Sequence, residues 1–215
     1  MKRTFMFAVV VMTAFAATAY AQMARKEVIL DAGKGGIELK VSVPEKMAGP
    51  MDFSGNDGVG GGDITSNGVT LYGKEAKFSG KLGETGRLIY WTTVGSTTSN
   101  TSKFSNDGLA QEMLSNYGQK LADAKIIQTT NPLIDDGTSV TYSVCSKVIF
   151  EQYKNENACS IVQTSVSKDR KKSASIMVSA GEKDLNKYNE NPSRYSNGTA
   201  KMFEDVIGNS KAKLK

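Results

Sequence analysis

The sequence predicts an α+β protein whose C-terminal part packs an amphipathic helix on an antiparallel β-meander. Apolar residues recur at helical spacing over 108–124, which is typical of a helix with one buried face. Residues 139–150 alternate apolar and polar side chains as a half-buried strand does, and two further strand-like segments follow at 158–166 and 173–180. These features place a helix-on-antiparallel-sheet domain over residues 69–215.

Residues 1–21 form the first element, a secretory signal peptide. Lys2 and Arg3 precede an apolar run over 5–17, and the small-residue sequence AYA closes the segment at Ala21. This run is too short for a membrane anchor, and no later segment is long and apolar enough to span a bilayer. We therefore expect an exported protein, periplasmic or extracellular, with no integral membrane span after cleavage.

The next elements are β-rich. Residues 22–51 predict a β-hairpin, because strand-like runs flank the sequence AGKGG, whose glycines can adopt the positive φ of a tight turn. Residues 52–68 hold six glycines in a polar context and are interpreted as a loop or linker. Short strands are then expected at three places: 68–73, 75–80 and 87–95.

The helix over 108–124 leads into the meander. A strand at 125–130 is expected to join the sheet through the turn at 131–137, with Ile126 near Tyr142. After the meander, residues 199–215 carry a helical apolar stripe and predict a C-terminal helix that docks on the sheet.

Matching apolar residues across neighbouring strands predicts the register of the meander. In the first hairpin this places Val144 opposite Val166. In the second it places Val162 opposite Val178, so that Val162 and Val166 share the inner face.

This register bears on the two cysteines, Cys145 and Cys159. They would face each other only with a turn centred on Gln152, which sets Val148 against Glu156 and is therefore rejected. In the preferred register they lie about 20 Å apart along the ladder at the usual strand rise. A disulfide cannot bridge that distance, so the sequence predicts no intramolecular disulfide.

Charge and composition restrict the chemistry. Removing Lys2 and Arg3 with the signal peptide lowers the formal net charge from +5 to +3, which is too little to indicate a nucleic-acid partner. The absence of histidine excludes Ser-His and Cys-His nucleophile pairs and histidine-ligated metals. The spacing of Ser165 and Lys168 matches a serine-x-x-lysine motif, but it ends a strand instead of opening a helix. No catalytic residue, metal set or cofactor is therefore predicted.

Two carboxylate-based alternatives stay open. Glu75 and Glu84 lie near Trp91 in sequence and could act as paired acids in a small envelope glycan hydrolase.

A second alternative places a weak calcium site in the glycine-rich stretch. Asp52, Asp57 and Asp63 supply the oxygen ligands that calcium prefers, although the stretch fits neither an EF-hand nor a repeated calcium motif.

Two segments are candidates for recognition. The basic cluster at 168–172 is interpreted first as a solvated hairpin turn and second as a contact for an acidic surface. The polar segment 188–198 has the composition of an adaptable contact surface, and within it we predict Tyr188, Arg194 and Tyr195 as binding residues. The expected function is a secreted or periplasmic non-enzymatic binding or assembly protein of the cell envelope, with an envelope protein as candidate partner.

Overall fold

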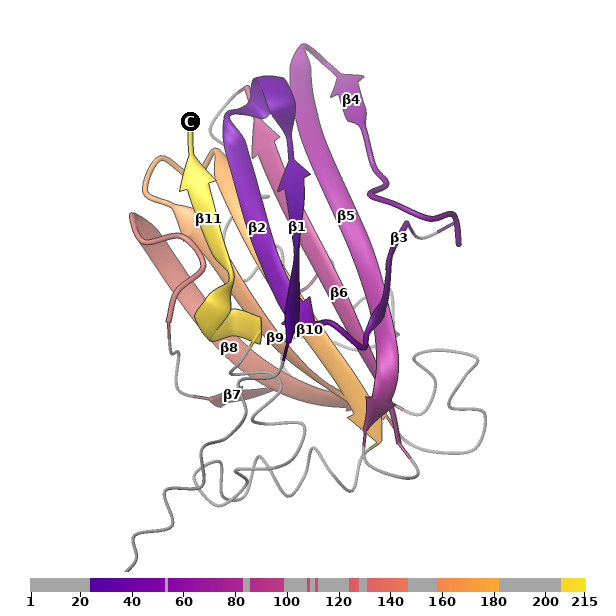
Figure 1. Ribbon diagram of the computed structural model, residues 1–215. Coiled ribbons are helices and arrows are strands. Elements are labelled where there is room, and N and C mark those ends of the chain that lie inside the picture. Colours follow the sequence, from indigo (N-terminus) through magenta and orange to yellow (C-terminus); the bar gives the residue numbers. More distant parts are fainter. Residues whose placement is uncertain are drawn as a thin grey trace, which may run out of the picture.

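Two antiparallel β-sheets pack face to face in the computed structural model (Figure 1). The structure describes residues 24–52, 54–82, 86–98, 108, 111, 124–127, 131–146, 158–181 and 206–215. The strands are β1 (Arg25–Asp31), β2 (Ile37–Pro44), β3 (Ala48–Met51), β4 (Asp63–Ser66), β5 (Val69–Leu82), β6 (Gly86–Thr97), β7 (Lys125–Ile127), β8 (Gly137–Ser146), β9 (Ala158–Ser167), β10 (Lys172–Gly181) and β11 (Lys211–Leu214).

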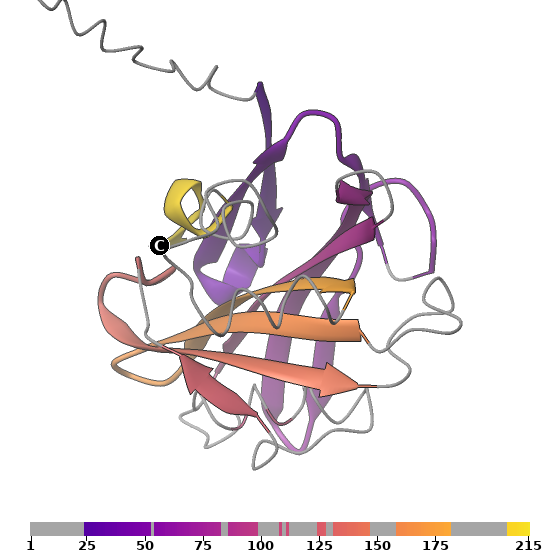
Figure 2. The same ribbon diagram turned by 90° about the horizontal axis from the view of Figure 1, so that it is seen from below.

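The smaller sheet has three strands in the order β1-β2-β11, and the larger has eight. In the larger sheet the order is β3-β5-β6-β10-β9-β8-β7, with β4 paired to β5 off this path. Figure 2 shows β1, β2 and the C-terminal segment on one side of the layer formed by β8, β9 and β10. The chain thus returns at its end to complete the sheet with which it begins.

Aliphatic side chains from both sheets fill the space between them. The small sheet contributes every second residue of β2, as the two-residue period of a strand requires. Each such side chain contributes about 1.5–3 kcal/mol when fully buried, so this core dominates the stability of the fold. Its fully buried members include Leu30, Ile37, Leu39, Val41, Val43, Phe78, Ile161, Ile176 and Val178.

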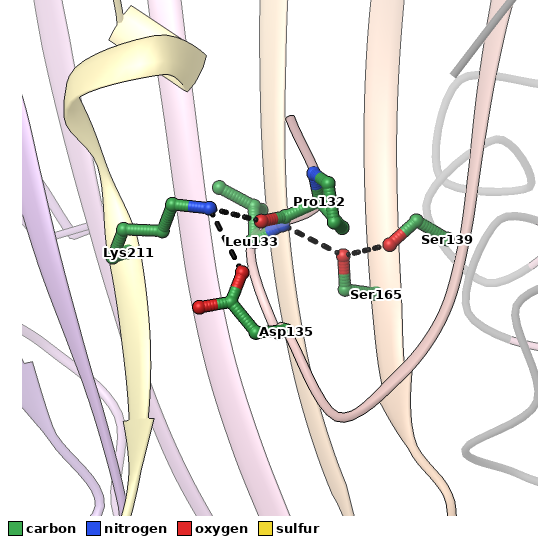
Figure 3. Close-up of polar contacts among 6 residues, drawn as sticks. All are labelled: Pro132, Leu133, Asp135, Ser139, Ser165 and Lys211. Atoms are coloured by element: carbon green, nitrogen blue, oxygen red, sulfur yellow. Dashed lines mark hydrogen bonds and ion pairs between the residues drawn. The ribbon is translucent and has the colours of Figure 1, made fainter. Parts of the chain in front are cut away.

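On one side of the sandwich, β9 and β11 are bridged by a loop, residues 131–136, and not by a further strand. Leu133 and Ile134 are buried in the core. The Leu133 amide donates to the Ser165 hydroxyl at 3.0 Å, and the Ser165 and Ser139 hydroxyls lie 2.6 Å apart (Figure 3). The loop is therefore fastened to the inner face of the large sheet.

The same loop also holds the last strand. The Ala212 amide donates to the Leu133 carbonyl at 2.8 Å. Lys211 Nζ donates to the Pro132 carbonyl at 2.9 Å and to Asp135 Oδ1 at 3.0 Å (Figure 3). These contacts bridge the two sheets through one loop.

The predicted α+β class is wrong. Across the described ranges, the regular elements are strands apart from the 3-10 turn η1 (Gly33–Gly35), a helical turn at 206–209 and the helical residues Gly108 and Gln111. The layer that packs on the core face of the large sheet is the sheet β1-β2-β11, not a helix. Most of the predicted helix over 108–124 lies outside the described residues. Within the part that is described, Gly108 and Gln111 are helical.

The predicted C-terminal helix is also wrong beyond Asn209, where the chain becomes strand β11. The sequence KAKL alternates lysines with Ala212 and Leu214, and pairing with β2 turns the two apolar residues toward the core. Period-two alternation favours a strand once an open edge of β2 is available. That edge comes from residues far away in sequence.

Strands β8, β9 and β10 form an antiparallel meander, and Ile126 lies opposite Tyr142 as predicted. Both predicted registers of the meander are wrong. Val144 pairs with Ser160 instead of Val166. Val162 pairs with Met177 instead of Val178, a slip of one residue that exchanges the two faces of β10.

Buried hydroxyl pairs explain the observed register. Because β9 is buried on both faces from Ser160 to Ser167, apolar alternation does not select one pairing. A buried hydroxyl without a partner is destabilising, so register follows the hydroxyl pairs. The opposed pairs are Ser160 with Ser179 at 2.6 Å, Thr164 with Ser175 at 3.0 Å, and the half-buried Ser139 with the buried Ser165 at 2.6 Å.

Gly137, the first residue of β8, provides a test of the β8–β9 register. An added Cβ would lie 2.0 Å from the Val166 carbonyl oxygen, a backbone atom that no side-chain rotation can remove. We expect Gly137→Ala to lower the free energy of unfolding by about 2–3 kcal/mol, measured by urea denaturation. Gly62→Ala is the control, since its Cβ meets nothing within 4 Å. Equal stability of the two variants would contradict the register.

Candidate functional site

The predicted binding residues Tyr188, Arg194 and Tyr195 lie outside the described residues and stay a prediction. The structure instead gathers basic residues at one end of the sandwich from three segments far apart in sequence. We call this group the cationic end. Its members are Lys34, Lys168, Arg170, Lys171, Lys172 and Lys215.

Two hydrogen bonds to backbone carbonyl groups bring the three segments together. Lys215 N donates to the Gly36 carbonyl at 2.8 Å, and Lys172 Nζ donates to the Lys215 carbonyl at 3.2 Å. Figure 1 shows η1, the β9–β10 turn and the end of β11 at the same end of the two sheets. Gly36 has φ of 67° and lies against both lysines, so a side chain there would be strained and crowded.

The basic cluster at 168–172 forms a hairpin turn between β9 and β10, as predicted. Asp169 Oδ1 accepts hydrogen bonds from the Ser167 hydroxyl at 2.6 Å and from Lys171 N at 3.1 Å. These bonds lower the pKa of Asp169, with the Ser167 hydroxyl the larger cause. Arg170 completes the turn with φ of 57°, a left-handed conformation that is rare for a residue with a long side chain.

Carboxylates at this end are already engaged by two lysines. Lys215 Nζ lies 2.7 Å from Asp31 Oδ2 and 3.0 Å from Glu38 Oε2, and Lys168 Nζ lies 2.6 Å from Asp136 Oδ1. The hydrogen bond from Lys215 lowers the pKa of Asp31, and the amide of the η1 turn lowers it further. Hydrogen bonding to Asp136 raises the pKa of Lys168, which favours the charged form of the lysine.

Two of the exposed cations at this end, Lys34 and Arg170, remain available to a partner. With the carboxylates of the described residues, Lys34 and Arg170 form no ion pair, and both side chains are exposed. A guanidinium and an ammonium on tight turns can donate charge-assisted hydrogen bonds to carboxylate or phosphate oxygens. Exposed charges attract such groups in a manner that salt weakens. The cationic end is therefore suited to contact an anionic surface.

Local sequence patterns did not reveal this site in full. The cluster at 168–172 was evident as a run of charge, but Lys34 and Lys215 are isolated lysines in sequence. Lys215 joins the cluster because β11 pairs with β2, and Lys34 joins it because Gly36, at the end of η1, lies against Lys172 and Lys215.

A second group of interest lies where the glycine-rich stretch meets β5. Gly60 and Glu75 exchange backbone hydrogen bonds at 3.0 and 3.2 Å, and an added Cβ on Gly60 would lie 2.5 Å from Asp52 Cβ. Burial raises the pKa of Glu75, and the charge of Asp52 raises it further. A hydrogen bond from Ser54 is the largest cause of the lowered pKa of Asp52.

The carboxylate pair suggested by sequence is only partly described. Glu84 lies outside the described residues, and Trp91 lies opposite Lys77 in the β5–β6 ladder. The acid that the structure places beside Glu75 is Asp52, contributed by the glycine-rich stretch.

The calcium alternative required Asp52, Asp57 and Asp63 to converge. In the part of the chain that the structure describes, no three acidic, cysteine or histidine side chains gather as a metal-binding group. Asp52 Oδ1 instead accepts from the Ser54 hydroxyl at 2.7 Å and from Asn56 N at 2.9 Å. Its carboxylate closes a local turn.

Neither a protein-family model nor a curated protein matches this chain. Within the described ranges, no helix has both the length and the apolar character needed to cross a membrane. The function is therefore inferred from the geometry of the cationic end and of the Glu75 region.

The charge network at the cationic end predicts a specific pKa change. We expect Lys215→Met to raise the pKa of Asp31 toward 3.8, because Lys215 is the largest cause of its lowered value. The interaction stabilises the fold above the unfolded-state pKa and is lost as pH falls through the folded-state pKa, below 3.8. NMR titration of the side-chain carboxyls measures these pKa values in the wild type and in the variant. The pKa of Asp169 should not change, and an unchanged pKa of Asp31 would refute the assignment.

Proposed function

We propose that this chain is an exported, non-enzymatic binding or assembly protein of the cell envelope, which contacts an anionic protein surface through its cationic end. The observation that carries the proposal is the convergence of η1, the β9–β10 turn and β11 at one end of the sandwich. Support for export comes from the signal-peptide pattern of residues 1–21.

The way these cations are held favours binding. Lys34 lies on η1, whose turn is fixed by the 2.7 Å hydrogen bond from Gly33 N to Asp31 Oδ1. Arg170 lies on a turn fixed by Asp169. Because both backbones are ordered before contact, a partner need not immobilise them, which reduces the entropic cost of association. Complementary charge at such a rim mainly raises the association rate and selects among partners.

Site-specific cross-linking in the native envelope tests the proposal. A photo-cross-linking residue at position 34 or 170 should capture the same protein, identified by mass spectrometry, whereas position 46 is an exposed lysine on the β2–β3 turn and serves as control. We expect Lys34→Glu to reduce capture from position 170, and Arg170→Glu to reduce capture from position 34, each about tenfold or more, because charge reversal replaces attraction with repulsion. Lys46→Glu should leave both captures unchanged. Capture of the same protein from all three positions, or of none, would refute the proposed surface.

A second candidate function is a small envelope glycan hydrolase, favoured by the opposed pKa shifts of Glu75 and Asp52. Two neighbouring carboxyls whose environments push their pKa values apart are suited to act as acid and base. The proton-bearing group would be Glu75, which is half-buried on β5.

Hydrolysis of isolated cell-wall glycan by the purified protein distinguishes the two functions. If the hydrolase function holds, Glu75→Gln should reduce the rate at least a hundredfold, because the amide cannot donate the proton that a leaving group needs. Asp57→Asn and Lys34→Glu are the matched controls and should retain the rate. A wild-type protein that releases no reducing ends would eliminate this candidate and leave the binding function in place.

A further inference from the structure

The chain has two cysteines, and the backbone places them directly opposite each other. Cys145 on β8 pairs with Cys159 on β9. The flanking pairs are Val144 with Ser160 and Ser146 with Ala158, so no bulge interrupts the ladder at this point. The same register extends without a shift along all ten paired positions of the two strands.

This placement satisfies the geometric condition for a cross-strand disulfide. Directly opposed residues of an antiparallel ladder have Cα atoms about 4.5 or 5.5 Å apart, depending on the type of pair. Both separations fall within the range of about 4.4–6.8 Å that disulfides span. Opposed residues also share one face of a sheet.

We propose that Cys145 and Cys159 form an intramolecular disulfide that joins β8 to β9. The oxidant is a disulfide of the thiol-oxidase or oxidised-glutathione class. One cysteine thiolate attacks that disulfide and releases one of its sulfurs as a thiolate; the second cysteine then attacks the mixed disulfide and releases the other. The two cysteine sulfurs lose two electrons and two protons, and the oxidant gains them as two thiols.

The bridge depends on the observed register. The register obtained by matching valines separates the cysteines by about 20 Å and forbids the bond, which is why the sequence predicts none. The proposed bond and the hydroxyl pair Ser139–Ser165 require the same alignment of β8 with β9. The prediction of separated cysteines is therefore overturned by the ladder, and with it the reason for expecting no disulfide.

The position of β8 gives the bridge a structural role. In the described part of the chain the sheet continues beyond β8 with β7, and β9 on the other side is buried on both faces from Ser160 to Ser167. A disulfide would fasten β8 to this buried strand. It would also close the segment between β8 and β9 and so restrict the unfolded chain.

Peptide mapping without reduction is the decisive experiment. The full-length protein is recovered from the compartment to which its host exports it, denatured with an alkylating agent, and digested. We expect one peptide pair joined through Cys145 and Cys159, no alkylated cysteine, and an intact mass that rises by about 2 Da on reduction. Quantitative alkylation of both cysteines, even after equilibration with oxidised glutathione, would overturn the proposal. So would a disulfide that joins two copies of the chain.

Two variants test the stabilising role and the dependence on register. The melting temperature of the double variant Cys145→Ser/Cys159→Ser should lie about 5–10 °C below that of the oxidised protein and should equal that of the reduced protein. In Cys159→Ser/Ser160→Cys the thiol moves by one position, to the opposite face of β9. This variant should form no bridge under the same oxidation; a bridge of equal yield would show that facing positions are not required.

Discussion

Pairs of buried hydroxyl groups align β8, β9 and β10, and the arrangement of the rest of the large sheet depends on that alignment. The central strand β9 has no solvent-facing side from Ser160 to Ser167, so its polar side chains must find partners inside the protein. Ser160 and Thr164 do so with β10, and Ser165 does so with β8 and with the loop that carries Leu133. A slip of one residue would bury several unpaired hydroxyls at once, each costing about 1–3 kcal/mol.

This alignment determines what lies at each end of the meander. At one end the β9–β10 turn begins after Ser167 and brings Lys172 to Lys215, the residue that follows β11. At the other end it brings Cys145 opposite Cys159. The surface proposed for binding and the bond proposed for stability therefore occupy opposite ends of β9 and depend on its pairing with β10 and with β8, respectively.

Local periodicity predicted much of the strand content but not the fold class. The strand over residues 139–146, the strand with Ile126 opposite Tyr142 and the turn at 168–172 were all evident from alternation and turn chemistry. The fold class was missed because the layer over the core is built from β1, β2 and β11, and β11 reaches β2 across most of the chain. The register was missed because valine matching ignores hydroxyl pairs, which are decisive in a strand buried on both faces.

The conformation of Arg170 links the turn to the function that we propose. Among the described residues, three non-glycine residues have positive φ, and the other two are Asn67 and Asn131, a residue type that tolerates this conformation. An arginine there costs about 1 kcal/mol that glycine would not, and the hydrogen bonds of Asp169 to Ser167 and Lys171 offset it. In return the turn carries an exposed guanidinium beside Lys171, with no ion-pair partner among the described carboxylates. A strained backbone that presents an unneutralised cation is more readily explained by contact with an anionic partner than by folding, since folding alone would favour glycine at this position.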